Sequence, residues 1–370
     1  MAGSRGTGRG FGAVAGVFII PAAVLLLGWN EVRTVGTERA LAEGAGAVRE
    51  APADRVDPAL EGRLVHLSGP LTVPGRLADP DFPGVQAPAG AVQLRRAVQT
   101  YQLQERSSRG GSYSYDQTWS DQVIDSTGFR GRGAPQNPVP RHLAWRVVAP
   151  EARLGPYRLG ETLLGALNGT EPLAVTEEAI RGAAGVRLFG NGAYVGPNPD
   201  VPTLGDQRIA WTAVRPETVS LIARQRGAGF VPYEAASGSS LSLISPGLLS
   251  AEEMLAQAGE ANTALAWATR FMGTGLLFLA FFLILRGMDP ARGWPARLAA
   301  VAGPGPARGA AVLAVMVPPA VILAAWLAMR PLVGAGVVVV AVLAGWWARR
   351  KAGAKDPPGP PSPSSRLPRN

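Results

Sequence analysis

Four long apolar segments constrain this chain more than any other feature of its sequence. A bilayer core is about 30 Å thick, so a helix that crosses it needs roughly 20 consecutive apolar residues. Residues 11–29, 264–285, 309–329 and 331–347 reach or approach that length and carry almost no charge. We therefore predict four transmembrane helices, one N-terminal and three C-terminal, with residues 30–263 forming a large water-facing domain.

The first and last of these segments each admit a second interpretation. Residues 11–29 lie where a signal peptide would, but they exceed its usual apolar length, and the bulky and polar residues from Trp29 onward do not suit cleavage. We interpret them as an uncleaved anchor. The last two segments are separated only by Arg330 and Pro331, so they form either a tight hairpin of two full spans or a re-entrant hairpin.

Positive charge flanks the apolar segments and is not concentrated in the domain. The chain has a net charge of +9, but residues 30–263 hold 22 arginines and 25 acidic residues. The excess positive charge lies mainly in residues 1–10, 286–308 and 348–370. Basic segments of this kind mark the cytoplasmic side of membrane proteins and do not indicate nucleic-acid binding. We expect two basic cytoplasmic tails, the second of them rich in proline, a basic cytoplasmic loop at 286–308 and an extracytoplasmic domain.

The composition excludes several kinds of chemistry. The chain has no cysteine and only two histidines, His66 and His142. Disulfides, thiolate nucleophiles and zinc–thiolate sites are therefore excluded, and we expect no metal site and no cofactor. Abundant alanine, glycine, proline and arginine are typical of a GC-rich genome. We therefore expect a bacterial, multi-pass cell-membrane protein; in a eukaryote the same layout would suit the endoplasmic reticulum or the inner nuclear membrane.

We predict that the large domain has an α+β fold with mostly antiparallel strands. Asn191 and Gly192 predict a type I′ hairpin turn. Ser250 and Glu253 form a capping box that begins a helix leading toward the second apolar segment. A further helix is expected at about 38–50. Alternating apolar residues predict strands in these segments: 63–68, 91–105, 117–127, 186–195, 208–214, 219–224, 230–233 and 241–244.

Two pairs of side chains carry chemistry that an enzyme could use. His66 and Ser68 face the same way on a strand, as in nucleophilic catalysis, but no orienting acid stands at a motif position. Asp121 and Asp125 would share one face of the predicted strand and serve as acid and base, or hold a cation. Both pairs also fit ordinary polar side chains on a solvated strand, which is the interpretation we prefer.

Two further motifs suggest ligand binding and have simpler explanations. Gly190, Gly192 and Gly196 resemble a phosphate-binding loop, but no helix follows them, and a hairpin turn explains the pattern. Residues 224–227 form a compact basic turn that would contact anionic headgroups or end a solvated strand. Away from their ends, the apolar segments carry no ionisable residue, which argues against transport; Arg270 lies near the start of its segment, where it can reach the headgroups. We predict no catalytic residues.

Several short motifs together resemble the LUMA family, also called transmembrane protein 43. They occur in order along nearly the whole chain, from the end of the first apolar segment to the junction of the last two. The residues that carry the resemblance are Gly28, Trp29, Asn30, Glu31, His66, Leu67, Ser68, Gly69, Trp119, Ser120, Asn137, Pro138, Arg224, Gln225, Arg226, Gly227, Arg330 and Pro331.

The resemblance implies four spans, one large domain after the first helix and no established catalytic residue. Animal members resemble organisers of the inner nuclear membrane that self-associate and bind lamins and emerin, partners that do not carry over to a bacterium. We therefore expect a membrane scaffold or interaction protein that contacts the lipid bilayer, itself and an unidentified protein partner. The alternatives are a membrane-surface enzyme and a channel or transporter subunit. Pro318 and Pro319, and the Pro-rich tail, depart from the family pattern.

Overall fold

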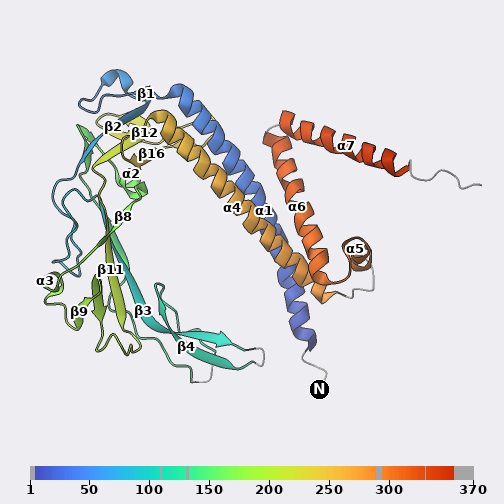
Figure 1. Cartoon of the computed structure of the whole chain (residues 1–370), viewed down its shortest axis with the longest axis horizontal. Helices are drawn as coiled ribbons and strands as arrows, with labels where there is room; N and C mark the ends of the chain where they lie inside the picture. The colour runs from blue at the N-terminus through green and yellow to red at the C-terminus, as the bar shows by residue number, and fades with distance from the viewer. Residues whose placement is uncertain (1–4, 109–110, 131–132, 289–293, 330, 354–370) are drawn as a thin grey trace, which may run out of the picture. The chain divides into compact units, whose positions relative to one another are not determined.

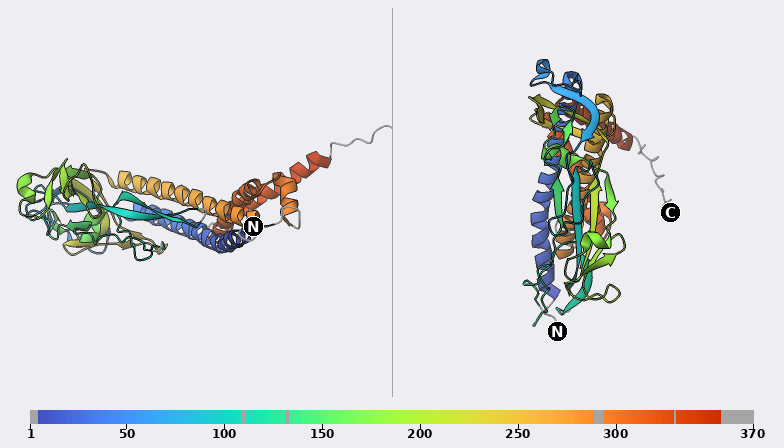
Figure 2. Two further views of the ribbon diagram at one scale, coloured as in Figure 1. Left: turned by 90° about the horizontal axis from the view of Figure 1, so that it is seen from below. Right: turned by 90° about the vertical axis from the view of Figure 1, so that its left-hand side faces the viewer.

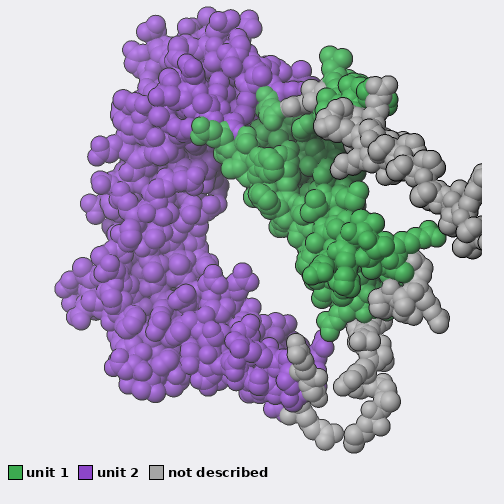
Figure 3. Space-filling model, turned by 45° about the vertical axis from the view of Figure 1, so that its right-hand side comes forward, with its two compact units in different colours: residues 1–38, 260–370 green, residues 39–259 purple. Residues whose placement is uncertain are grey.

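The computed structural model contains two compact units. We call residues 1–38 with 260–370 the helical unit, and residues 39–259 the sheet unit (Figure 3). The described residues are 5–108, 111–130, 133–288, 294–329 and 331–353 (Figure 1). The predicted linker residue Arg330, part of the predicted loop 286–308 and residues 354–370 of the predicted tail lie outside them.

Long helices build the helical unit, and two of them also contribute residues to the sheet unit. The five helices are α1 (Arg5–Ala47), α4 (Ala251–Gly287), α5 (Trp294–Ala302), α6 (Pro306–Met329) and α7 (Pro331–Gly353). Three of them, α1, α4 and α6, are long and apolar enough to cross a membrane, which confirms a membrane protein with several such helices. Helix α7 contains a shorter apolar stretch, Gly334–Ala344, so the fourth span stays a prediction.

Helices α1 and α4 approach each other within the helical unit (Figure 2), and their close packing depends on small residues. A Cβ atom on Gly16 would meet the carbonyl oxygen of Ala280 at 2.6 Å, and one on Gly273 would meet Leu27 at 2.6 Å. Small residues let helix backbones approach closely in lipid, where packing and not water exclusion drives association. Leu27 is fully buried in the cluster that joins these helices to α6.

The sheet unit contains two seven-stranded sheets and a two-stranded ribbon. The first sheet has the order β13-β12-β2-β6-β7, with β1 beside β2 and β16 beside β12. Its strands are β1 (Arg49–Glu50), β2 (Leu64–Thr72), β6 (Arg153–Leu154), β7 (Tyr157–Arg158), β12 (Thr218–Arg226), β13 (Gly229–Val231) and β16 (Leu243–Pro246). All pairings in it are antiparallel except that of β1 with β2.

The second sheet has the order β4-β3-β11-β10-β9, with β5 beside β3 and β8 beside β11, and is antiparallel throughout. Its strands are β3 (Gln93–Ser107), β4 (Tyr113–Ser120), β5 (Trp145–Val148), β8 (Thr170–Leu173), β9 (Val186–Phe189), β10 (Gly192–Val195) and β11 (Gln207–Val214). The ribbon pairs β14 (Tyr233–Glu234) with β15 (Ser240–Leu241). Short helices are η1 (Pro58–Leu60), α2 (Glu161–Ala166) and α3 (Glu177–Ile180). The mostly antiparallel α+β domain is confirmed.

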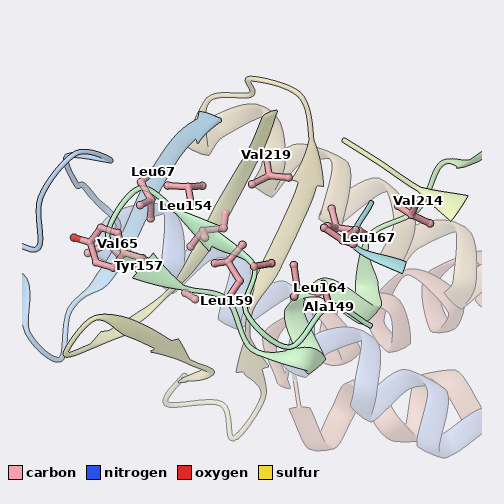
Figure 4. Close-up of a cluster of buried hydrophobic side chains, with 14 residues drawn as sticks. Val65, Leu67, Ala149, Leu154, Tyr157, Leu159, Leu164, Leu167, Val214 and Val219 are labelled. Carbon is pink, nitrogen blue, oxygen red and sulfur yellow. The ribbon is translucent and has the colours of Figure 1, made fainter. Parts of the chain in front are cut away.

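Apolar side chains from alternating strand positions fill the core of each sheet. Figure 4 shows the cluster of the first sheet, where Val65 and Leu67 of β2 lie with Leu154 and Tyr157, all at most 1% exposed. Burial at about 25 cal/mol per Å² of apolar surface is the main favourable term for such clusters. A separate cluster packs under the second sheet.

A buried ion pair lies within the core of the second sheet. Asp79 is 1% exposed and accepts hydrogen bonds from Arg96 and from the indole of Trp211, at 2.6 and 2.7 Å. Arg96 also contacts Asp81 at 2.6 Å. Partial burial of Asp81 acts against its ionisation, but the Arg96 guanidinium and His142 still hold the pKa of that carboxyl below its usual value. Two carboxylates therefore neutralise one guanidinium.

Local sequence signals predicted some elements well. Ser250 and Glu253 exchange the hydrogen bonds of a capping box at the start of α4, which continues without a break into the apolar segment. The β9–β10 hairpin is confirmed, but its turn is formed by Gly190 and Asn191, one residue earlier than predicted. Only Gly190 has a positive φ, of 57°, which excludes the type I′ turn.

One other prediction needs correction, and two features of the helices were not anticipated. The strand predicted at 117–127 ends at Ser120, because the Ser120 hydroxyl bonds to Gln122 and turns the chain away. Helix α6 continues through Pro318 and Pro319. The helix α5 within the predicted loop 286–308 was missed.

We expect Asp79→Ala to destabilise the sheet unit strongly. The change leaves Arg96 and the Trp211 indole without their buried partner, and breaking a buried pair costs about 3–5 kcal/mol. The thermal midpoint of the full chain in detergent, followed by circular dichroism, should fall by several degrees. The control is Asp116→Ala, which removes an ion pair of similar length, 2.9 Å to Arg106, at an exposed site. Its cost should be at most about 1 kcal/mol, and equal shifts in the two variants would contradict the assignment.

Candidate functional site

His66 lies where the chain enters and leaves the first sheet. It belongs to the long strand β2, and the short strand β1, directly after α1, runs parallel to it and places Glu50 opposite His66. On its other side, β12 places Ile222 opposite His66. Leu249, just before α4, also reaches the ring. The sequence did not reveal Glu50 as a partner, because a two-residue strand carries no periodic signal.

Both ring nitrogens of His66 face hydrogen-bond acceptors. Nδ1 is 2.8 Å from the Glu50 carboxylate, and Nε2 is 2.9 Å from the carbonyl oxygen of Leu249. A neutral imidazole has one N–H donor, whereas the doubly protonated ring has two. Both ring nitrogens are therefore occupied by acceptors other than Ser68, which does not suit a base that takes a proton from Ser68.

Ser68 resembles the nucleophile of a triad in order but not in geometry. Its hydroxyl lies 3.4 Å from Nε2 of His66 and only 2.6 Å from the hydroxyl of Ser220. Ser220, fully buried, donates to the carbonyl of Gly247 and accepts from the amide of Leu249. The cluster of Glu50, His66, Ser68 and Ser220 thus holds the segment before α4 against the sheet.

The structure does not bring Asp121 and Asp125 together on one strand face, because both lie in the turn region after β4. The exposed carboxylate of Asp125 accepts hydrogen bonds from the amide and hydroxyl of Thr127, at 2.9 and 2.6 Å, and these bonds lower its pKa. Asp121 lines a pocket on the second sheet. A paired acid and base is therefore not formed by these two residues.

The other predicted motifs have structural roles. Gly190 belongs to the hairpin turn, and Gly192 has the carbonyl of Ile209 in the place that a Cβ atom would occupy. Gly196 leaves room in the same way for the carboxylate of Asp206. None of these three glycines precedes a helix, so the fold does not support a phosphate-binding loop at this position.

The basic turn at 224–227 connects β12 to β13. Its buried member, Gln225, donates to the carbonyl of Asp57 at 2.8 Å and accepts from Tyr157. Gly227 takes a φ of 57°, and its amide donates to Glu61. The turn therefore fastens the loop before β2 to the end of β12.

Asn137 and Asp206 play similar roles in the second sheet. The Asn137 side chain exchanges two hydrogen bonds with the backbone of Leu103, replacing a strand partner. The Asp206 carboxylate accepts from the amide of Thr203 and from the Tyr194 hydroxyl, at 2.9 and 2.7 Å. Burial raises the pKa of Tyr194, and the hydrogen bond to Asp206 adds to the increase. Trp119 packs beside Tyr101 and under the guanidinium of Arg208.

A row of polar side chains joins α1 to α4 within the helical unit. Asn30 donates to the carbonyl of Ala266, and Asn262, one turn earlier on α4, donates to the carbonyl of Thr34. Arg33 also donates to the side chain of Asn262 at 2.9 Å. Residues four apart lie on one helix face, so the row follows the seam of an antiparallel helix pair.

An ion pair continues this row. Arg270 donates from Nε and Nη2 to the two oxygens of Glu31, at 2.8 and 2.9 Å, and Trp326 of α6 donates its indole N–H to the same carboxylate at 3.1 Å. The Glu31 side chain is 1% exposed. The arginine therefore pairs with a carboxylate, a partner that the sequence did not reveal. Three apolar helices meet at one carboxylate.

Sequence reasoning missed this contact, although a signal was present. Glu31 directly follows the first apolar segment, and Arg270 is a charged residue near the start of the second. Opposite charges at the adjoining ends of two antiparallel apolar segments fit an ion pair, but their separation of 239 positions gives no local pattern. Of the remaining motif residues, Pro331 begins α7, and Arg330 lies outside the described residues.

These features define a class of protein. Apolar helices long enough to cross a membrane accompany a mostly antiparallel sheet domain, and the described residues contain no group of three or more His, Cys, Asp or Glu side chains placed to hold a metal ion. The chain is an integral membrane protein with one large domain inserted between its first and second long apolar helices.

Comparison with known proteins identifies the family. The family model described as Transmembrane protein 43 matches residues 95–331. The Drosophila melanogaster homolog of transmembrane protein 43 is 32% identical over 286 residues, covering 72% of this chain and 74% of that protein. The Homo sapiens protein is 29% identical over 298 residues, covering 74% of each. No solved structure matches. The chain belongs to the transmembrane protein 43 family.

The comparison contradicts the expectation of a bacterial protein. The relatives that match include those of rat, fly and human, which are eukaryotic. The expectation rested on abundant alanine, glycine, proline and arginine. Such a composition reports the base content of a genome and carries no direct information about the kind of organism.

We expect single changes of the ion pair to destabilise the helical unit and the double exchange to restore part of the loss. Glu31→Arg or Arg270→Glu places like charges in a buried site, where an unpaired charge costs about 3–5 kcal/mol. The double variant re-forms opposite charges on the same two helices. Yield and thermal midpoint of the full chain in detergent report the effect. Arg286→Ala, an exposed change on the same helix, is the control, and additive losses in the double variant would argue against direct pairing.

Proposed function

We propose that this chain is a multi-pass membrane scaffold that acts by binding and organising other proteins. The observation that carries the proposal is the position of His66. Its two ring nitrogens contact Glu50, just after α1, and Leu249, just before α4. The polar residues that most resemble a catalytic group therefore fasten the two chain segments that lead to the helices.

The motif residues support the same proposal. Asn137 and Gln225 use their side chains to hold loops against strands, and Glu31 joins three helices. A rigid domain held at both of its connections to membrane helices suits a protein that presents surfaces to partners. The family name carried by the relatives describes a membrane protein and names no reaction.

We further propose that the large domain lies on the side of the membrane away from the cytoplasm, with α7 as a fourth span. The basic residues outside the domain support this orientation, because positively charged segments stay on the cytoplasmic side. In a eukaryotic cell the domain would then lie on the lumenal side of the endoplasmic reticulum membrane or of the inner nuclear membrane. Both termini would be cytoplasmic, as they would be for a re-entrant hairpin.

Single-cysteine labelling tests this topology without background, because the chain has no cysteine. In sealed membrane vesicles of cytoplasm-outward orientation, a cysteine replacing Ala354 should react with an impermeant thiol reagent, and one replacing Ser112, an exposed residue of the sheet unit, should react only after detergent is added. The reverse pattern would invert the topology. Labelling of both in sealed vesicles would place both segments in the cytoplasm.

Self-association through the C-terminal helices is part of the proposal, and two glycines of α7 separate it from internal packing. A Cβ atom on Gly334 would meet the backbone of Leu327 in α6 at 2.9 Å, whereas Gly336 has no neighbouring atom within 4 Å. Gly334 therefore serves the contact between α6 and α7. Gly336 leaves an open small-residue surface that a second copy could approach closely.

We expect Gly336→Leu to reduce crosslinking between copies in membranes severalfold while the thermal midpoint of the chain stays unchanged. The extra side chain keeps the second backbone at a distance without touching the chain's own helices. Gly334→Leu is the matched variant and should lower the thermal midpoint. Unchanged crosslinking in Gly336→Leu would remove this surface from the proposal.

A membrane-surface enzyme is the second candidate, because Glu50, His66 and Ser68 stand in the order of a catalytic triad. Ser68→Ala decides between the two. It removes a hydroxyl that an enzyme would need and that a scaffold uses only for local hydrogen bonds. If this variant folds but fails to complement a deletion, a membrane-surface enzyme replaces the scaffold as the proposed function. A channel or transporter subunit has no specific contact in its favour.

A further inference from the structure

The edge of the long strand β3 has a gap in its pairing. Residues 93–96 of β3 pair with β5, and residues 100–107 pair with β4, so both short strands lie along the same edge. Residues 97–99 lie between them and have no partner strand on that edge among the described residues. The intervening chain leaves β4 at Ser120 and returns at Trp145.

A pocket of about 480 Å³ is located at this gap. Three of its lining residues stand abreast on neighbouring strands: Arg146 of β5 is opposite Arg95 of β3, and Arg95 is opposite Thr212 of β11. Side chains at directly opposite positions project from the same face of a sheet. Two guanidiniums and one hydroxyl therefore line the pocket side by side.

The guanidiniums of Arg95 and Arg146 form no ion pair in the described part of the chain, although the carboxylate of Asp121 lines the same pocket. Like charges directly opposite each other on neighbouring strands are destabilising. Arg96 also lines the pocket, but its guanidinium differs because Asp79 and Asp81 already hold it.

Arg95 is held in place before any ligand arrives. Its Nε and Nη2 donate to Oε1 of Gln93, at 3.1 and 2.6 Å. Gln93 is fully buried, and its amide nitrogen donates to the carbonyl oxygens of Leu164 and Leu167 at the end of α2. This leaves Nη1 of Arg95 and the whole guanidinium of Arg146 free of hydrogen bonds in the described structure. A binding group held by a buried neighbour loses little freedom on binding.

We propose that this pocket binds an oxyanion of the phosphate class, held between the guanidiniums of Arg95 and Arg146 with the hydroxyl of Thr212 as a further donor. Guanidinium groups match the oxygens of phosphate in charge and geometry. The bound anion removes the repulsion between the two arginines. Asp121 also lines the pocket and opposes the anion. The phosphate is either a free ion or the headgroup of a lipid, and the site is independent of the scaffold proposal.

The test uses the full chain in detergent and measures its thermal midpoint against inorganic phosphate and pyrophosphate, with chloride at matched ionic strength. Ligands that bind only the folded state raise the midpoint with concentration. We expect saturable stabilisation by phosphate or pyrophosphate, weakened about tenfold in affinity by Arg146→Ala, the loss of roughly one charge-assisted hydrogen-bonding group. Asp121→Asn should bind more tightly. Arg153→Ala, an exposed arginine of the other sheet, should bind as the unchanged chain does.

Folding of the variants is read from their midpoints without ligand, where Arg146→Ala should match or exceed the unchanged chain because it removes the like charge. A second arm uses nanodiscs of phosphatidylcholine with and without phosphatidate. Binding to soluble phosphate assigns a free ion, and an Arg146-dependent effect of phosphatidate alone assigns a lipid headgroup. The proposal is overturned if neither ligand binds, if Arg146→Ala binds normally, or if Arg153→Ala loses as much affinity.

Discussion

The helical unit depends on the neutralisation of one buried carboxylate. Glu31 has almost no contact with water, and a charge in such a place is tolerated only when it is paired and hydrogen-bonded. Arg270 supplies the opposite charge through two hydrogen bonds, and Trp326 supplies a third donor. Gly16 and Gly273 let the two helices approach closely. The pair fixes the register of α1 against α4 and directs α6 to the same point.

Buried polar and charged side chains of the sheet unit are also paired or hydrogen-bonded, each with a different partner. Asp79 is paired with Arg96, and Asp206 accepts hydrogen bonds from Tyr194 and Thr203. His66 completes the series, because its position between Glu50 and Leu249 joins the two ends of the unit to β2. Each of these three groups thus has at least one partner on another strand or loop, which makes one arrangement of the strands more favourable than its alternatives.

The sequence was informative where the physics is local. The apolar segments, the capping box of Ser250 and Glu253 and the long alternating run of β3 each depend on residues a few positions apart, and all were predicted. The hairpin turn was placed one residue late, because Asn–Gly outweighed the preceding glycine that takes the positive φ. Glu50 beside His66 and Glu31 beside Arg270 depend on pairings across the fold, which composition and periodicity do not encode. The resemblance located both groups without giving their partners.

Arg95 and Arg96 show how solvent decides which charges need a partner within the chain. Neighbours on a strand point to opposite faces, so Arg96 enters the core, where Asp79 and Asp81 neutralise it, and Arg95 faces water beside Arg146. Two unit charges 4 Å apart interact by about 1 kcal/mol in water and several times more in a protein interior. The repulsion between Arg95 and Arg146 is therefore small enough to persist in the folded chain without a carboxylate in ion-pair contact with either arginine. A bound anion would relieve this repulsion, and the relief would add to its affinity. The attraction for an oxyanion therefore arises from the strand register, which places Arg95 opposite Arg146.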